Sequence, residues 1–141
     1  MPDTDIDLAS GVAAFEAKEF SKALKLLSPY AERGNADAQY RMAIMYQNGL
    51  GVVRNDSLAY RWMRAAADQG HALAQHGLGF MFLQGECAPK NESEAAAWFR
   101  RAADQGLAGS QMTLGTLYEQ GLGVEKDADE ARKWYDRASR A

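Results

Sequence analysis

Few residues of this chain could carry out catalysis or hold a metal. It has two histidines, His71 and His76, and a single cysteine, Cys87. The histidines are five residues apart, which does not place them on one face of a helix, and no other histidine or cysteine stands at metal-ligand spacing. A reactive thiolate at Cys87 would need positive charge nearby, and only Lys90 offers it. We therefore predict no catalytic residue and no metal site: His71 starts a helix, His76 is a groove or packing residue, and Cys87 is an incidental loop residue.

Two glycine-rich segments could in principle cradle a phosphate. They are Gly49-Leu50-Gly51 and Gly121-Leu122-Gly123. A phosphate loop follows a strand and continues into Gly-Lys-Ser/Thr or a full dinucleotide fingerprint, and neither feature is present. Turns that end helices explain the glycines better, so we expect no bound cofactor.

Composition narrows the class of protein. The net charge of −3 lacks the basic stripe that phosphate binding requires, so no nucleic-acid partner is expected. The start Met1–Asp7 has neither the basic nor the apolar region of a secretory signal. The longest nearly apolar stretch, Gly77–Leu83, is far shorter than the roughly 20 residues of a membrane span. With one cysteine there is no intrachain disulfide, and a cytoplasmic location is expected. A chain from which a secretory leader had been removed would look the same.

A repeat organises most of the chain. The five residues Ala66–Gly70 recur unchanged at Ala102–Gly106, 36 positions later. A repeat of this length indicates stacked structural units. We expect a flexible start (1–7), a shorter helix pair (8–33) and three repeats (34–70, 71–106 and 107–141) within one continuous domain.

Each repeat is predicted to hold two helices. Small and apolar residues at helical spacing, such as Ala38, Met42 and Met45, predict a first helix over about residues 36–47. Gly49, Gly85 and Gly121 follow it, where glycine ends helices in the left-handed conformation. Asn55, Asn91 and Asp127 then stand as N-caps of a second helix, whose buried stripe is Ala59, Trp62, Met63 and Ala66 and their equivalents.

The first pair departs from this pattern. Between Gly11 and Ala23 it has four residues fewer than the later units, so its loop should be shorter. Pro29 cannot donate within a helix, and we expect a kink near Ser28.

These residues resemble the Sel1-like repeat, a subfamily of the tetratricopeptide-repeat superfamily. The resemblance is carried by Ala36–Tyr40, Met45–Val52, Ala65–Gly70 and Gly121–Val124, and it covers residue 34 to the end. It implies an all-α, right-handed α-solenoid of stacked antiparallel helix pairs. The middle loop departs from the family because Cys87 replaces the second glycine. The paired cysteines of some secreted members are also missing.

In such a solenoid the first helix of each pair lines the concave side. The resemblance thus implies a partner-binding groove made by the positions that do not pack within the repeats: Tyr40, Ile44, Gln47, His76, Phe80, Leu83, Met112, Thr116 and Glu119. The functional interpretation is a protein–protein interaction module or adaptor that binds a peptide or partner helix, with Tyr40, His76 and Phe80 as anchors. Alternatively, superhelical curvature, the Leu8–Phe15 helix or a second copy of the chain covers these residues. In that last case the protein is a regulatory or structural subunit that acts mainly as a homo-oligomer, for example a homodimer.

The last helix is more polar than its equivalents. Arg132, Lys133, Arg137 and Arg140 could bind an acidic partner. A solvated face that caps the stack is the better interpretation, because solenoids need such a polar end.

Overall fold

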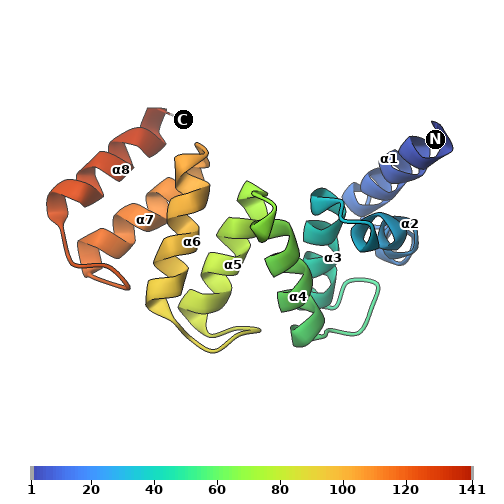
Figure 1. The fold of residues 1–141 in the computed structure, drawn as a ribbon, viewed down its shortest axis with the longest axis horizontal. Helices are drawn as coiled ribbons and strands as arrows, with labels where there is room; N and C mark the ends of the chain where they lie inside the picture. The colour runs from blue at the N-terminus through green and yellow to red at the C-terminus, as the bar shows by residue number, and fades with distance from the viewer. Residues whose placement is uncertain (1, 141) are drawn as a thin grey trace. The chain divides into compact units, whose positions relative to one another are not determined.

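The structure, a computed structural model, describes residues 2–140, with side chains from Ile6 onward. Across these residues the chain forms eight helices and no strand (Figure 1). They are α1 (Pro2–Glu16), α2 (Phe20–Glu32), α3 (Ala36–Asn48), α4 (Asp56–Asp68), α5 (Ala72–Gln84), α6 (Glu92–Asp104), α7 (Ala108–Gln120) and α8 (Ala128–Arg140). The helices of the three repeats begin and end close to the predicted positions.

The helices group into two compact units, Met1–Gln69 and Gly70–Ala141. In unit 1, α1 packs on α2, α2 on α3, and α3 on α4. In unit 2, α5 packs on α6, α6 on α7, and α7 on α8. Each unit therefore contains two helix hairpins joined by packing of the second helix of one hairpin on the first helix of the next. The single continuous domain stays a prediction.

The helix ends follow the predicted capping. Gly49, Gly85 and Gly121 take left-handed φ values of 65°, 69° and 71° and close α3, α5 and α7. The side chain of Asn55 accepts a hydrogen bond from the backbone N–H of Leu58 at 3.0 Å, and Asn91 and Asp127 cap α6 and α8 in the same way. These side chains satisfy N–H groups that a helix start leaves without an intrahelical partner. The predicted N-caps and C-terminal glycines are confirmed.

The first hairpin differs from the prediction at its start. Helix α1 begins at Pro2 rather than at Leu8, and Met1 lies outside the described residues. Helix α2 continues through Pro29 to Glu32, and the Ser28 hydroxyl donates to the carbonyl of Leu24 at 2.7 Å. The kink expected near Ser28 stays a prediction. The shorter connection is confirmed: residues 17–19 link α1 and α2, whereas residues 49–55 link α3 and α4.

The middle loop keeps the geometry of its neighbours despite the cysteine. Cys87 has a φ of 64°, close to the 67° of Gly51 and the 72° of Gly123 at the equivalent positions. At Gly123 the conformation alone is not the constraint, because a Cβ there would lie 2.0 Å from the carbonyl oxygen of Glu92 at the start of α6. This loop thus lies directly on α6, and only glycine fits.

The core of each unit is built from alanines and large side chains in alternation. Trp98 and Trp134 are buried in unit 2, while Trp62 is partly buried and packs against the unit 1 core. The predicted inward tryptophan stripe is thus confirmed, with Trp62 less enclosed than the other two.

Candidate partner-binding surface

The two histidines have different places in the structure. His71 is the N-cap of α5, and its Nδ1 accepts from the N–H of Ala74 at 3.1 Å, as its predicted place at a helix start requires. Among the described residues no group of three His, Cys, Asp or Glu side chains is arranged to hold a metal ion. His71 thus caps the start of α5. Among the two histidines, only His76 is a predicted site residue.

In unit 1 the predicted site residues lie along α3. Tyr40, Ile44 and Gln47 are all half-buried. Burial raises the pKa of the Tyr40 phenol above its ordinary value, so the hydroxyl stays neutral. Next to it, Arg41 pairs with Asp37 at 2.9 Å and its guanidinium lies 4.9 Å from the ring centre of Phe15. This face of unit 1 is therefore mixed, with charged and aromatic groups interleaved.

In unit 2 the predicted anchors His76 and Phe80 form an aromatic cluster with Phe99. The rings of His76, Phe80 and Phe99 meet edge to face, with centroids 5.0 Å apart for His76–Phe80, 5.4 Å for His76–Phe99 and 4.9 Å for Phe80–Phe99. Phe99, on α6, is fully buried, whereas His76 and Phe80 on α5 are half-buried. Such aromatic pairs are worth about 0.5–1.5 kcal/mol each beyond their buried area. The anchors are therefore held in place by a core residue.

A hydrogen bond joins α5 to α7 across this cluster. His76 Nδ1 lies 2.7 Å from the Ser110 hydroxyl, and Ser110 is fully buried. Gly109 also approaches the ring, since a Cβ at this glycine would be 3.6 Å from His76 Cε1. Burial lowers the pKa of His76 below its ordinary value because it disfavours the charged imidazolium. His76 is thus held between two helices in a form that favours the neutral ring.

Beside these half-buried rings, large apolar side chains are exposed. Leu73 on α5 is 46% exposed and Met112 on α7 is 51% exposed. Helical spacing puts Leu73 on the face of His76 and Phe80, and puts Met112 and Thr116 on the face of Gly109, which lies against His76. We refer to Leu73, His76, Phe80, Met112 and Thr116 as the α5/α7 surface. Unit 2 thus brings four of its six predicted site residues together.

The remaining predicted residues of unit 2 lie toward the other ends of these helices. Leu83 is half-buried near the end of α5, and Glu119 is exposed near the end of α7. Glu119 lines a cavity of about 210 Å³ together with Ala128, Ala131, Arg132 and Tyr135. Glu119 therefore belongs to the surroundings of α8 rather than to the aromatic cluster.

Two contributors to this surface, Ser110 and Phe99, were not among the predicted site residues. By the 36-residue spacing, Ser110 is equivalent to Ala38 and Ala74, which are small packing residues, and Phe99 is equivalent to Met63 in the buried stripe of the second helix. The available signal was a serine at a position where the first two repeats have alanine, 34 residues after His76. The bond itself depends on the distance between α5 and α7, which the pattern does not contain.

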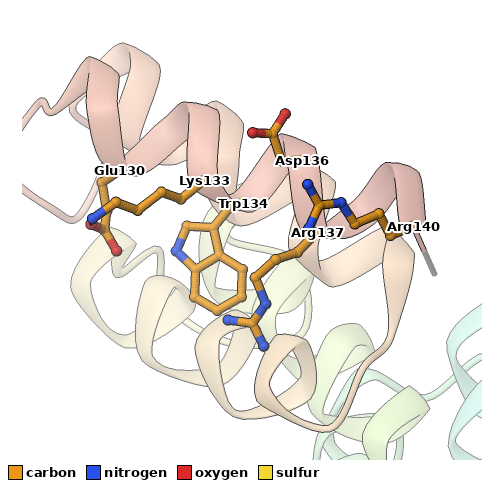
Figure 2. A pocket seen from close by; sticks show the side chains of 6 residues that line it. All are labelled: Glu130, Lys133, Trp134, Asp136, Arg137 and Arg140. Carbon is orange, nitrogen blue, oxygen red and sulfur yellow. The ribbon is translucent and has the colours of Figure 1, made fainter.

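The basic face of α8 forms a separate cavity of about 340 Å³. Its lining comes from α8 alone: Glu130, Lys133, Trp134, Asp136, Arg137 and Arg140 (Figure 2). The Arg137 guanidinium lies 4.3 Å from the centre of the Trp134 ring. Lys133 lies 3.8 Å from Glu130, and Arg132 lies 4.0 Å from Asp129. Acidic neighbours on the same helix offset Arg132 and Lys133, which supports the solvated cap over an acidic-partner site.

Comparison with known proteins identifies the repeat. Residues 36–71, 72–107 and 108–141 each match the family model of the Sel1 repeat. Among curated proteins none matches the chain. No helix within residues 2–140 is both long enough and apolar enough to cross a membrane.

Solved structures give the same result. A Sel1 repeat protein from Oxalobacter formigenes is 36% identical with a TM-score of 0.90, over 94% of this chain and 55% of that one. The protein c5321, a protective antigen of uropathogenic Escherichia coli strains with an SLR fold, is 33% identical with a TM-score of 0.91, over 97% of this chain and 30% of that one. Cysteine-rich protein B of Helicobacter pylori shares the fold at 18% identity, with a TM-score of 0.69 over 86% of this chain and 90% of that one.

This chain therefore spans about half or less of the length of the two more similar structures. Sel1 repeats generally serve as scaffolds for protein–protein interaction and are typically not enzymes. Since the matched repeats cover most of its length, this chain belongs to the Sel1 repeat family, whose fold is an all-α solenoid of helix pairs.

Proposed function

We propose that this protein is an interaction module whose unit 2 binds an apolar peptide or helix of a partner protein on the α5/α7 surface. The observation that carries the proposal is the exposure of Leu73 (46%) and Met112 (51%) beside the half-buried rings of His76 and Phe80. Exposed apolar groups that are contiguous mark sites of contact with other chains. Helix binding in particular uses apolar anchors that fit between two neighbouring helices.

The packing beneath this surface supports the proposal. Phe80 rests on Phe99, and His76 is bonded to Ser110, so the anchors are ordered before a partner arrives. A binding surface that is already ordered loses little conformational entropy on association. The chain has one cysteine, Cys87, and so few cysteines suit a reducing compartment, which supports a cytoplasmic location.

The test replaces the two exposed side chains and leaves the packed ones in place. In the variant Leu73→Asp/Met112→Asp, two charges enter the proposed contact, and we expect the helical circular dichroism to stay unchanged because both positions are largely exposed. Partner proteins retained by the wild type from native extract, quantified by mass spectrometry, should be lost by this variant. Val53→Asp is the matched control, since Val53 is an 85% exposed hydrophobic residue in a loop of unit 1. Phe80→Asp is a poorer probe because it would also disturb Phe99.

A photo-crosslinking amino acid at position 112 would detect direct contact between a partner protein and the α5/α7 surface. Crosslinks to the same partner from position 112, but not from position 53, would agree with the proposal. Equal capture by the wild type and the Leu73→Asp/Met112→Asp variant would contradict it. The homo-oligomer is the second candidate, and the crosslink would then join two copies of the chain.

A further inference from the structure

His76 has one nitrogen inside unit 2 and one at its surface. Nδ1 lies 2.7 Å from the hydroxyl oxygen of Ser110, which is fully buried. Nε2 makes no hydrogen bond within residues 2–140 and is not one of the buried, unpartnered side-chain atoms of this part of the chain, so it is open to solvent. Gly109 lies next to it, because a Cβ at this glycine would be 3.9 Å from Nε2 and 3.6 Å from Cε1. The α5/α7 surface therefore includes an imidazole edge that Gly109 has no side chain to cover.

The Ser110 hydroxyl is the donor in its bond with His76. A hydroxyl carries one hydrogen, and burying that hydrogen without an acceptor is costly. Within residues 2–140 the acceptor that this hydroxyl meets is His76 Nδ1. If Nδ1 carried the ring proton instead, the hydroxyl hydrogen would be buried without an acceptor. The neutral ring therefore carries its proton on Nε2, at the surface.

Packing alone does not require a serine at this position. The equivalent residues of the first two repeats are Ala38 and Ala74, and both are 0% exposed, as Ser110 is. What the hydroxyl adds is the bond to His76. Because a hydrogen bond at one ring nitrogen decides what the other nitrogen offers, Ser110 makes Nε2 a donor.

The other polar group of the α5/α7 surface already has partners. The Thr116 hydroxyl donates to the carbonyl of Met112 at 3.2 Å, and the Tyr135 hydroxyl lies 3.0 Å from it. Its single hydrogen is therefore used. A partner that covers the exposed Leu73 and Met112 would also take the His76 Nε2–H away from water. That donor would then be buried without an acceptor unless the partner supplies one.

We propose that His76 Nε2–H is a specificity-determining donor of the α5/α7 surface and that the partner's apolar segment presents an amide oxygen to it. Both a backbone carbonyl and the side chain of Asn or Gln have this chemistry. A carboxylate is a poorer match, because the apolar surroundings would remove water from its charge. The proposal rests on the proposed function for where the partner lies, whereas both of its tests use the protein without a partner.

The first test locates the ring proton. At about pH 8, above the ordinary pKa of histidine, proton–nitrogen correlation spectra of the ¹⁵N-labelled protein should place the His76 proton on Nε2. His71 is the internal reference, since its Nδ1 accepts from the N–H of Ala74 and its own proton therefore also lies on Nε2.

Ser110→Ala is the matched variant, and it copies the first two repeats, so we expect it to keep the helical circular dichroism. In this variant a fraction of His76 should carry the proton on Nδ1, while the His71 signals stay in place. A proton on Nδ1 in the wild type, or the same His76 nitrogen shifts in both proteins, would overturn the proposal.

The second test supplies the acceptor as a small molecule. N-methylacetamide has the carbonyl of a backbone amide and acetamide that of an Asn or Gln side chain. We expect them to shift the His76 Nε2 signal at about 0.1 M, because such small ligands bind weakly. The larger of the two shifts identifies the source of the oxygen. N-methylthioacetamide has nearly the same shape and a sulfur atom, which is a weak acceptor, so its shift should be smaller.

Acetate, compared with the same concentration of sodium chloride, tests the carboxylate and should also give a smaller shift. The His71 Nε2 signal reports effects that are not specific to the α5/α7 surface. A His76 shift no larger than that of His71, or one that is larger with acetate or the thioamide than with the amides, would overturn the proposal. Equal partner capture by the wild type and the Leu73→Asp/Met112→Asp variant would instead contradict the proposed function and would leave these measurements unchanged.

Discussion

At the scale of single residues, His76 connects the core of unit 2 to its surface. One edge of the ring contacts Phe99, which is fully buried, and Nδ1 bonds to the buried Ser110 hydroxyl. The rest of the ring belongs to the α5/α7 surface beside the exposed Leu73 and Met112. A charge on this ring would therefore affect both the stability of unit 2 and an apolar partner.

The stability of the protein should depend on the protonation of His76. Burial lowers its pKa in the folded protein, so between the folded and the unfolded pKa the unfolded chain binds more protons. This contribution to stability is fully present above the ordinary pKa of histidine and is lost as the pH falls below it. We expect the free energy of urea unfolding to decrease between about pH 7.5 and about pH 5. In His76→Asn, whose amide can still reach Ser110, the decrease should be smaller. An identical pH dependence in the variant would show that other groups cause it.

At the scale of helices, small residues on one helix match large ones on its partner. A Cβ at Gly79 of α5 would lie 2.9 Å from Cζ of Phe99, and a Cβ at Gly115 of α7 would lie 2.8 Å from Cε1 of Tyr135. In the first repeat the equivalent residues are Ala43 and Met63, and both are buried. Glycine thus stands opposite an aromatic ring and alanine opposite a flexible thioether, which lets α5 and α7 pack closely on α6 and α8.

This pairing predicts compensation between two positions. Gly79→Ala gains about 1 kcal/mol of helix propensity and loses about 1–3 kcal/mol by crowding the Phe99 ring, so we expect a net loss of stability. In Gly79→Ala/Phe99→Met, which copies the first repeat, the loss should be about 1 kcal/mol smaller than the sum of the single changes. The measurement is a double-mutant cycle by urea unfolding.

Gly109→Ala is the control for that cycle. Its Cβ would lie at an ordinary contact distance of 3.6 Å from His76, so this change should not destabilise. Strict additivity of Gly79→Ala and Phe99→Met would argue against the compensation.

At the scale of the whole molecule, the chain combines a repeat scaffold with a modest charge of −3 and an apolar surface on unit 2. Nothing in that charge balance supplies long-range attraction to nucleic acid. The interaction expected of the α5/α7 surface is short-ranged and apolar, so it should depend little on salt. The two alternatives for what binds this surface are a different protein and a second copy of the same chain.

Mass in solution distinguishes these alternatives. We expect size-exclusion chromatography with light scattering to give 15.5 kDa, the mass of one chain, at micromolar concentration. The Leu73→Asp/Met112→Asp variant should elute at the same volume. A doubled mass for the wild type that the variant returns to 15.5 kDa would favour the homo-oligomer instead.

The sequence by itself predicted the helices, their ends and the family. Gly49 and Asn55 illustrate why: a left-handed glycine or a capping side chain acts on backbone groups a few residues away, so the local sequence contains the whole cause. The same holds for the 36-residue period, which is visible without any knowledge of distances. Where the prediction was wrong, as at the start of α1, the sequence has no capping signal.

The tertiary structure alone decided which predicted residues are packed and which are exposed. Phe80 and Met112 were both predicted to line the groove, yet Phe80 rests on Phe99 and is half-buried while Met112 is half-exposed. The His76–Ser110 bond likewise depends on how closely separate helices pack. Sequence periodicity tells which side of a helix a residue occupies, whereas burial and bonding depend on what the neighbouring helix places opposite it.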